Sequence, residues 1–310
     1  MGILVSYIIP VFQNLDYCLK LINDIIEKDQ KSFEILLVDD GSQPEIKCEI
    51  KKVKTIRNPV NGGPSIARNL GASQAKGKYL FFLDSDIFIS ANKREEIINE
   101  IQEYKSTVIM GVYDPISPLA NICSIYKNLY WSYNQINILN NKNNFCTAIF
   151  IIEKQIFNHI NGFNEELRIG EDREFGERIL ENSYDFFSKS KYCGYHYKYF
   201  NFVTLVCHHF KNSESVAIFL LNKIFNTQKI NQKNKILTNY MQMLTIPCGF
   251  LLFLTSMLLI LNILSIKIGV VLLLICSFIF LYLIKDFLNF AKKSYGYKIY
   301  FMIILLYLIE

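Results

Sequence analysis

The sequence predicts an α/β protein, a mostly parallel sheet flanked by helices, followed by a hairpin of transmembrane helices. The sheet is predicted because β-rich runs at 6–11 and 33–38 bracket a segment, 15–26, whose apolar residues recur at helical spacing. Strands that alternate with helices lie parallel, with helices on both faces of the sheet. The hairpin is predicted because residues 244–284 contain a single charged residue, Lys267.

The next segments continue the alternation of strands and helices. Strands are expected at 53–56, 79–83 and 145–152, and a helix at 65–75 with Pro64 near its first turn. Ligands of such sheets bind beyond the carboxyl ends of the strands. Acidic residues that directly follow a strand therefore lie where a ligand would bind.

The composition excludes several classes of protein. A chain of 310 residues that is 51% hydrophobic has enough apolar side chains for a large core, so disorder is not expected. The net charge is +5 and the basic residues form no long stripe, so no nucleic-acid partner is expected. The eight cysteines lie far apart without a CxxC pair, which is typical of reduced thiols in a cytosolic protein.

Residues 244–284 are long enough for two membrane helices. At about 1.5 Å per residue they would extend about 61 Å, roughly twice the hydrocarbon core, so helices are expected at about 244–264 and 267–284. Lysines precede this segment, at 223–235, and follow it, which places both ends in the cytoplasm by the positive-inside rule. The last apolar run, 299–309, predicts an interfacial helix or a span cut short. A buried hairpin of a soluble protein is the alternative.

Carboxylates follow two of the predicted strands. Asp39 and Asp40 end one apolar strand, where their oxygens can accept hydrogen bonds from a sugar or a base, although Asp-Gly is also a common turn. The strand at 79–83 leads into Asp84 and Asp86. Two carboxylates two residues apart can share Mg²⁺ or Mn²⁺, which in turn neutralises a diphosphate. Solvated loop carboxylates are the alternative.

These motifs, in their order and spacing, resemble the family 2 glycosyltransferases, which are inverting enzymes with the GT-A fold. The resemblance covers roughly residues 3–215. The segments that carry it are 9–14 (IPVFQN), 39–42 (DDGS), 61–69 (NGGPSIARN), 77–86 (GKYLFFLDSD) and 170–172 (GED).

The resemblance implies which residues bind the donor and the metal. In the family, the early Asp pair and the Gly-Gly-x-x-x-x-Arg segment line the nucleotide pocket, the residue matching Asp84 contacts the ribose, and Asp86 would hold Mn²⁺ or Mg²⁺. A guanidinium beside a diphosphate is a strong bidentate donor, which supports Arg68, and a solvated helix charge is its alternative. The implied substrate-binding residues are Pro10, Asp39, Asp40, Arg68, Asp84 and Glu171.

The resemblance also implies a general base. The family's acceptor-side motif matches 170–172, and its Asp, here Asp172, takes the proton of the acceptor hydroxyl opposite the leaving diphosphate. A structural acidic pair at a helix N-terminus is the alternative. Some family members use a histidine near position 208 as a further metal or diphosphate ligand, which implies His208. A packed or solvated pair with His209 is equally open.

The sequence therefore predicts transfer of one sugar from a nucleotide-diphosphate sugar, with UDP favoured, to a lipid-linked or cell-surface glycan acceptor. A single addition is expected because Trp131, the only tryptophan, precedes the base, whereas processive relatives carry Gln-x-x-Arg-Trp after it. One alternative is a sugar nucleotidyltransferase, but that class needs a Gly-rich phosphate loop that 10–14 does not offer. A non-catalytic membrane protein of the same fold is the other alternative.

Three regions follow from these patterns. Residues 1–215 would form the glycosyltransferase domain, 216–243 a basic juxtamembrane linker or interfacial helix, and 244–310 the membrane region. The protein would be multi-pass, with its catalytic domain in the cytoplasm. The Lys-, Asn- and Ile-rich usage is typical of bacteria, which indicates a bacterial inner membrane.

Overall fold

The computed structural model describes most of the chain and divides it into two compact units. The first unit comprises Met1–Leu119 and Asn134–Tyr199, and the second comprises Ala120–Tyr133 and Phe200–Glu310. The expected boundary at 215 and the lysines at 223–235 lie outside the described residues, and residue 243 lies inside a described helix. The expected regions stay a prediction. The described residues are 2–104, 107–139, 145–167, 170–210, 240–261, 263 and 265–308.

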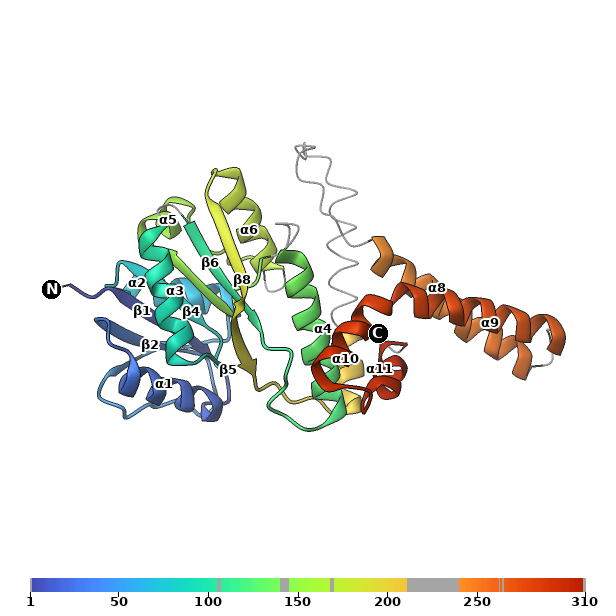
Figure 1. Ribbon diagram of the computed structural model, residues 1–310. Helices are drawn as coiled ribbons and strands as arrows, with labels where there is room; N and C mark the ends of the chain where they lie inside the picture. The colour runs from blue at the N-terminus through green and yellow to red at the C-terminus, as the bar shows by residue number, and fades with distance from the viewer. Residues whose placement is uncertain are drawn as a thin grey trace. The chain divides into compact units, whose positions relative to one another are not determined.

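The first unit is built on an eight-stranded sheet with the order β3-β2-β1-β4-β7-β6-β8-β5 (Figure 1). Neighbours from β3 to β4 pair in parallel, as do β6 and β8, whereas β7 runs antiparallel to both β4 and β6, and β5 runs antiparallel to β8. The expected α/β sheet is confirmed, with β7 and β5 as its reversed strands. The strands are β1 Val5–Val11, β2 Phe33–Asp40, β3 Val53–Asn58, β4 Tyr79–Leu83, β5 Ile87–Phe88, β6 Thr107–Tyr113, β7 Ile149–Glu153 and β8 Asp185–His196.

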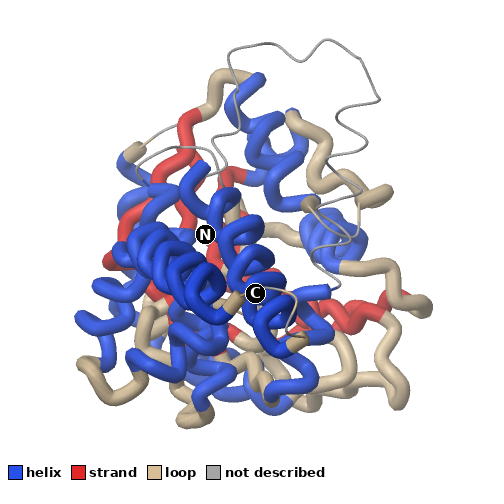
Figure 2. The backbone as a smooth tube through the Cα atoms, turned by 90° about the vertical axis from the view of Figure 1, so that its right-hand side faces the viewer, coloured by secondary structure: helices blue, strands red, loops and turns tan. Residues whose placement is uncertain are grey.

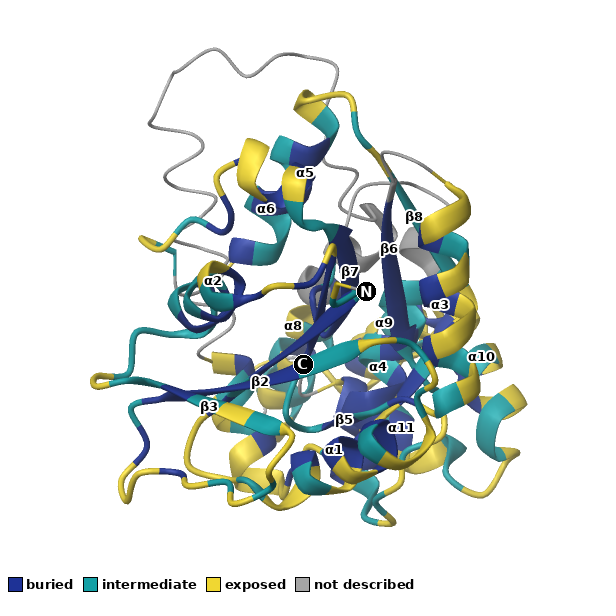
Figure 3. Cartoon of the chain, turned by 90° about the vertical axis from the view of Figure 1, so that its left-hand side faces the viewer, coloured by how far each residue is buried: buried dark blue, intermediate teal, exposed yellow. Residues whose placement is uncertain are grey.

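Helices cover both faces of this sheet, which explains why its central strands are apolar runs and do not alternate. On one face, buried residues of β1, β2 and β4 pack against α1 and α3; on the other, they pack against α2, α5 and α6. Figure 3 shows these strands as buried and the outer sides of the helices as exposed. The helices are α1 Asp16–Lys28, α2 Pro64–Gln74, α3 Ala91–Glu103, α5 Lys154–His159 and α6 Glu171–Glu181.

A buried charge cluster joins α1 to α3. Arg94 is fully buried, and its guanidinium lies 2.9 Å from Asp24 Oδ2 and 2.5 Å from Asp29 Oδ1. The Tyr7 hydroxyl donates a further hydrogen bond to Asp29. A buried charge is tolerated only when it is paired, so this cluster fixes how the two helices pack on β1.

The described part of the second unit is helical (Figure 2). Helix α8 (Tyr240–Ile260) packs along α9 (Ile266–Leu283), and the Cys248 thiol donates to the Cys276 carbonyl over 3.4 Å. Two shorter helices follow, α10 (Lys285–Tyr295) and α11 (Tyr300–Tyr307). Residues 202–210 are also helical. Helix α4 (Ile122–Leu139) begins in the second unit and continues into the first.

The expected membrane hairpin is supported in part. Among the described helices, α9 is long and apolar enough to cross a membrane, with 18 residues and a mean hydropathy of 2.6. The apolar part of α8, Cys248–Ile260, is shorter. The apolar run at 299–309 forms α11, and its last residue lies outside the described part of the chain.

Candidate active site

The carboxyl ends of β1, β2 and β4 lie at one edge of the sheet, because these strands are parallel neighbours. Val11 at the end of β1 pairs in register with Asp39 near the end of β2. Asp84 follows β4 at the same edge, where its amide donates to the Ala148 carbonyl over 3.1 Å. Pro10 lies in β1 beside Val38, and its role in binding a donor stays a prediction.

Asp39 is fully buried, and both of its oxygens are engaged within the protein. It accepts hydrogen bonds from the amides of Ser42, over 2.9 Å, and Ile46, over 3.2 Å, and it is paired with the Arg57 guanidinium. Burial alone would raise the pKa of Asp39, but these hydrogen bonds and the Arg57 charge outweigh it and hold that pKa below its ordinary value. Asp39 therefore organises the turn after β2, and its contact with a donor stays a prediction.

Asp40 holds the glycine segment that precedes α2. Its carboxylate accepts hydrogen bonds from the amides of Gly62 and Gly63, over 3.0 and 2.8 Å, and from the Asn58 side chain over 2.8 Å. Gly63 has a φ of 92°, a backbone conformation that glycine adopts without strain. The carboxylate thus fixes the start of α2, the helix that carries Arg68.

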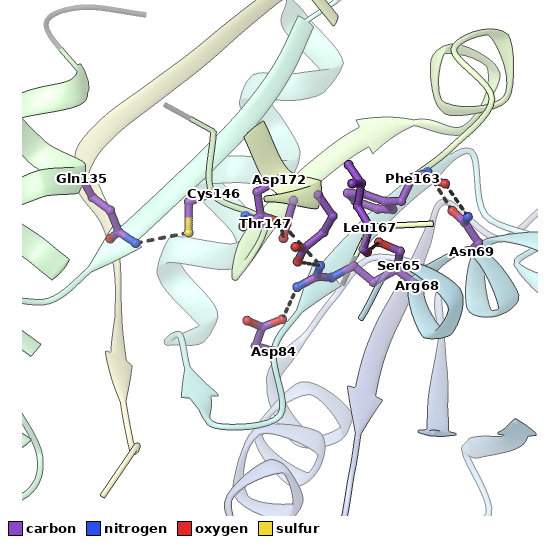
Figure 4. Close-up of polar contacts among 11 residues, drawn as sticks. Ser65, Arg68, Asn69, Asp84, Gln135, Cys146, Thr147, Phe163, Leu167 and Asp172 are labelled. Atoms are coloured by element: carbon purple, nitrogen blue, oxygen red, sulfur yellow. Dashed lines mark hydrogen bonds and ion pairs between the residues drawn. The ribbon is translucent and has the colours of Figure 1, made fainter. Parts of the chain in front are cut away.

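Arg68 is the centre of the site and is 4% exposed. Its Nη2 lies 2.8 Å from Asp84 Oδ1, and its Nη1 lies 3.3 Å from Glu171 Oε1 and 3.6 Å from Asp172 Oδ1 (Figure 4). Burial alone would lower the pKa of Arg68, but the three carboxylates outweigh burial and raise it, so the guanidinium stays charged. One buried cation therefore links the residue after β4 to the start of α6.

Side chains on α2 also hold the segment that leads into α6. The Ser65 hydroxyl donates to the Leu167 carbonyl over 3.2 Å, and the side-chain amide of Asn69 donates to the Phe163 carbonyl over 2.8 Å. The ring of Phe163 lies 5.4 Å from the Arg68 guanidinium. The segment from 163 to 167 is thus tied to α2 at several points.

Glu171 and Asp172 begin α6 after Gly170, whose φ is 83°. Burial, and then the charge of Asp172, raise the pKa of Glu171. Burial also raises the pKa of Asp172, and Arg68 and a hydrogen bond from Thr147 oppose that rise without cancelling it. The acidic first turn that the structural alternative requires is present. That alternative does not account for the pairing of both carboxylates with Arg68.

Asp86 is paired with a histidine that the sequence did not indicate. Its Oδ2 lies 3.4 Å from Nε2 of His196, a residue that is 4% exposed and stacks on Tyr113 at a ring distance of 4.3 Å. The pairing arises because Ile87 of β5 is the register partner of His196 in β8. Burial would raise the pKa of Asp86, but His196 and then Lys198 outweigh it and lower that pKa, which favours the carboxylate.

His208 lies in the second unit, where its ring packs edge-on against Trp131 at 5.6 Å and Phe200 at 5.3 Å. Its neighbour His209 is buried, and burial and then the charge of Lys127 lower the pKa of His209 to about 4. The packed histidine pair is therefore present. The role of His208 as a metal ligand stays a prediction.

The chemistry of the site fits a hard divalent cation. Within the described residues, no group of three His, Cys, Asp or Glu side chains could hold a metal ion by itself. Mg²⁺ and similar ions bind through one or two carboxylates, with waters and substrate phosphates completing the shell. Asp86 keeps 29% of its side chain exposed, and its lowered pKa favours the anionic ligand that such an ion requires.

The chain belongs to glycosyl transferase family 2. The model of that family matches residues 6–160, half of the chain. A second model, described as the N-terminal domain of galactosyltransferase, matches residues 127–206. The family expected from the sequence motifs is thereby confirmed.

Known proteins match parts of the chain. An uncharacterized glycosyltransferase of Haemophilus influenzae is 28% identical over 207 residues, which are 63% of this chain and 69% of that protein. The poly(ribitol-phosphate) beta-N-acetylglucosaminyltransferase TarP of Staphylococcus aureus is 32% identical over 118 residues, which are 35% of this chain and 36% of TarP. Six other glycosyltransferases are matched over 15% to 47% of their own lengths, so this chain spans less than half of each.

A solved structure shares the fold. The mannosyltransferase PcManGT of Pyrobaculum calidifontis, in complex with GDP-Man and Mn²⁺, aligns with a TM-score of 0.55 and covers 75% of this chain and 67% of that protein. The sequences are 12% identical, so the likeness concerns the fold.

Proposed function

We propose that this chain is an inverting, metal-dependent glycosyltransferase that moves one sugar from a nucleotide-diphosphate sugar to an acceptor hydroxyl. The observation that carries the proposal is the buried Arg68 guanidinium, which contacts Asp84 and the Glu171–Asp172 pair at once. Asp84, the proposed donor-binding carboxylate, and Asp172, the proposed base, thereby lie within reach of one cation. A donor bound at Asp84 and an acceptor bound at Asp172 would lie side by side, which would make their reaction an effectively unimolecular step.

The proposed donor is a UDP-sugar and the proposed acceptor a cell-surface or lipid-linked glycan. TarP supports transfer of a sugar to a polymeric acceptor, since its name specifies an N-acetylglucosaminyl group and a poly(ribitol-phosphate) acceptor. PcManGT supports a divalent cation beside the nucleotide, because it was solved with Mn²⁺ and GDP-Man. In this chain Asp86 and His196 would hold that cation. The bound ion would neutralise charge that develops on the diphosphate.

The proposed base is Asp172. Its side chain is 30% exposed, so an acceptor hydroxyl has access to the carboxylate. The acceptor oxygen forms a bond to the anomeric carbon of the sugar while its proton moves to Asp172. The bond between that carbon and the diphosphate oxygen breaks, and the nucleoside diphosphate leaves with the electron pair. Attack from the opposite face inverts the anomeric centre.

Asp172→Asn should separate chemistry from binding. The amide keeps the shape of the carboxylate but cannot take a proton, so turnover should fall by about 10² to 10⁴ while donor affinity survives. Release of nucleoside diphosphate and donor binding are measured on the same purified variant. Glu174→Gln is the matched control, because Glu174 lies in the same first turn of α6 and pairs with Arg178. Unchanged turnover in Asp172→Asn would assign the residue a structural role and leave Glu171 as the next base to test.

The Asp86→Asn variant tests the metal. Loss of the carboxylate charge should abolish Mn²⁺-dependent turnover and weaken Mn²⁺ binding, because a hard cation requires an anionic oxygen ligand here. Mn²⁺ is titrated into wild type and variant, and turnover is followed with and without EDTA. Asp185→Asn is the control, since Asp185 is exposed at the start of β8. Activity of the variant at the wild-type level in EDTA would contradict the metal assignment.

We also propose that the C-terminal helices anchor the chain in a membrane, with the catalytic unit in the cytoplasm. The support is α9, in which 11% of the residues are buried. The helix exposes large side chains such as Ile266, Leu274 and Phe278. Lys285 follows this helix and lies 4.1 Å from the ring of Tyr282, a combination typical of the edge of a bilayer.

Cell fractionation tests the anchor. The full chain should remain in the membrane pellet after an alkaline carbonate wash, because that wash releases peripheral proteins and leaves spanning helices in the bilayer. A chain ending at residue 239, before α8, should move to the soluble fraction. Full-length protein in the soluble fraction without detergent, or folded truncated protein in the pellet, would contradict the proposal.

A further inference from the structure

Thr147 contacts the proposed base directly, although neither the sequence motifs nor the family comparison singles it out. The residue is fully buried in the loop before β7. Its hydroxyl donates a hydrogen bond to Asp172 Oδ1, and its amide lies 3.4 Å from Asp172 Oδ2 (Figure 4). A hydrogen bond to an ionised carboxylate stabilises the charged form, so this hydroxyl acts on the group that must accept a proton.

The two oxygens of Asp172 are held unequally. Oδ1 receives the Thr147 hydroxyl and lies 3.6 Å from Arg68 Nη1. Within the described residues, the contact of Oδ2 is the Thr147 amide at 3.4 Å, which is long for a hydrogen bond. Oδ2 is therefore the oxygen that remains available to an acceptor hydroxyl.

The loop that carries Thr147 is fixed on both sides of the residue. Phe145 packs against Phe175 of α6 at a ring distance of 5.7 Å, and the Ala148 carbonyl accepts the Asp84 amide. The Cys146 thiol sulfur accepts a hydrogen bond from the Gln135 side chain over 3.2 Å. Because these contacts hold the loop against α6 and the end of β4, the Thr147 hydroxyl has a defined position relative to Asp172.

We propose that Thr147 is a positioning residue for proton transfer: together with Arg68 it anchors Asp172 Oδ1 and leaves Oδ2 to take the acceptor's proton. The inference rests on the proposed function, because it assigns a role within that reaction. Groups that face Asp172 from the neighbouring elements are Arg68 on α2, Asp84 after β4, Glu171 on α6, and the side chains of Cys146 and Tyr113. All of them remain when Thr147 is changed, so the difference between variants reports the hydroxyl.

The pH dependence of turnover distinguishes this role from a structural one. Thr147→Val keeps the size of the side chain and removes the donor, so the protonated form of Asp172 gains relative to the anion. The acidic limb of the kcat profile should move up by about one to two pH units, the equivalent of a hydrogen bond to a charged group. Donor affinity should not change. Thr147→Ser retains a hydroxyl and should restore the wild-type limb.

Ser6→Ala is the matched control. Ser6 is fully buried near the start of β1, and its hydroxyl donates to Glu34 over 2.7 Å and accepts from the Gly77 amide over 2.8 Å. Loss of this hydroxyl should lower the melting temperature and leave the pH profile of turnover in place. If Thr147→Val does not fold, Thr147→Ala removes the same donor and takes its place.

The experiment measures nucleoside diphosphate release by the full chain with Mn²⁺. The donor is whichever of four sugar nucleotides the wild type hydrolyses fastest: UDP-N-acetylglucosamine, UDP-galactose, UDP-glucose or GDP-mannose. An upward shift of the acidic limb in Thr147→Val, restored by serine and absent in Ser6→Ala, supports the role of Thr147. A wild-type profile in Thr147→Val, an equal loss in Thr147→Ser, or the same shift in Ser6→Ala overturns it. A wild type that hydrolyses none of these sugar nucleotides overturns the proposed function itself. An active wild type, together with a Thr147→Val variant whose acidic limb is not shifted, overturns only this inference.

Discussion

A buried guanidinium can persist only when anionic partners surround it, and Arg68 meets that constraint with three carboxylates from two separate parts of the chain. One partner follows β4 and the other two begin α6, so the cation joins the edge of the sheet to a helix that is remote in sequence. The pairing stabilises both the cation and the carboxylates. Arg68 stays charged because the carboxylates surround it, and the carboxylates approach one another because Arg68 lies between them.

Other contacts of the site serve to place this cation. Asp40 fixes the glycines before α2, and Ser65 and Asn69 tie that helix to the segment that leads into α6. The approach of Asp172 to Arg68 is thus determined by hydrogen bonds from side chains of α2 as well as by charge. The same contacts limit the rise in the pKa of Asp172. Burial raises that pKa, whereas the Arg68 charge and the hydrogen bond from Thr147 lower it. A base with such a pKa is better matched to proton transfer near neutral pH than an ordinary solvated carboxylate.

The sequence predicted those parts of the fold that depend on local pattern. Apolar runs identified β1, β2 and β4, and the acids that follow them marked the edge of the sheet where the site lies. Arg68 and Asp172 were inferred from a motif, and their contact with each other could not be predicted, since it depends on how α2 and α6 pack. Arg94 was equally unpredictable, because it lies in a charged run that is typical of an exposed helix and yet is fully buried.

Two residues of the site escaped prediction for identifiable reasons. The strand expected at 145–152 begins at Ile149, so Thr147 belongs to a loop whose contacts have no sequence pattern. His196 ends β8, a strand that was not predicted because its middle alternates Ser and Lys and carries little apolar signal. His208 was favoured by analogy of position, whereas the contact with Asp86 is made by His196 through the pairing of β5 with β8.

We propose that the Arg68 guanidinium couples the donor side of the site to the base, and the turnover of an Arg68→Lys variant tests this coupling. Lysine keeps the positive charge but offers a single ammonium group in place of a planar fork, so it cannot contact Asp84 and Glu171 in the same way. The kcat for nucleoside diphosphate release should fall by about 10- to 100-fold, the equivalent of one lost hydrogen bond to a charged group. Wild-type kcat in a folded Arg68→Lys variant would show that charge alone suffices and would contradict this coupling.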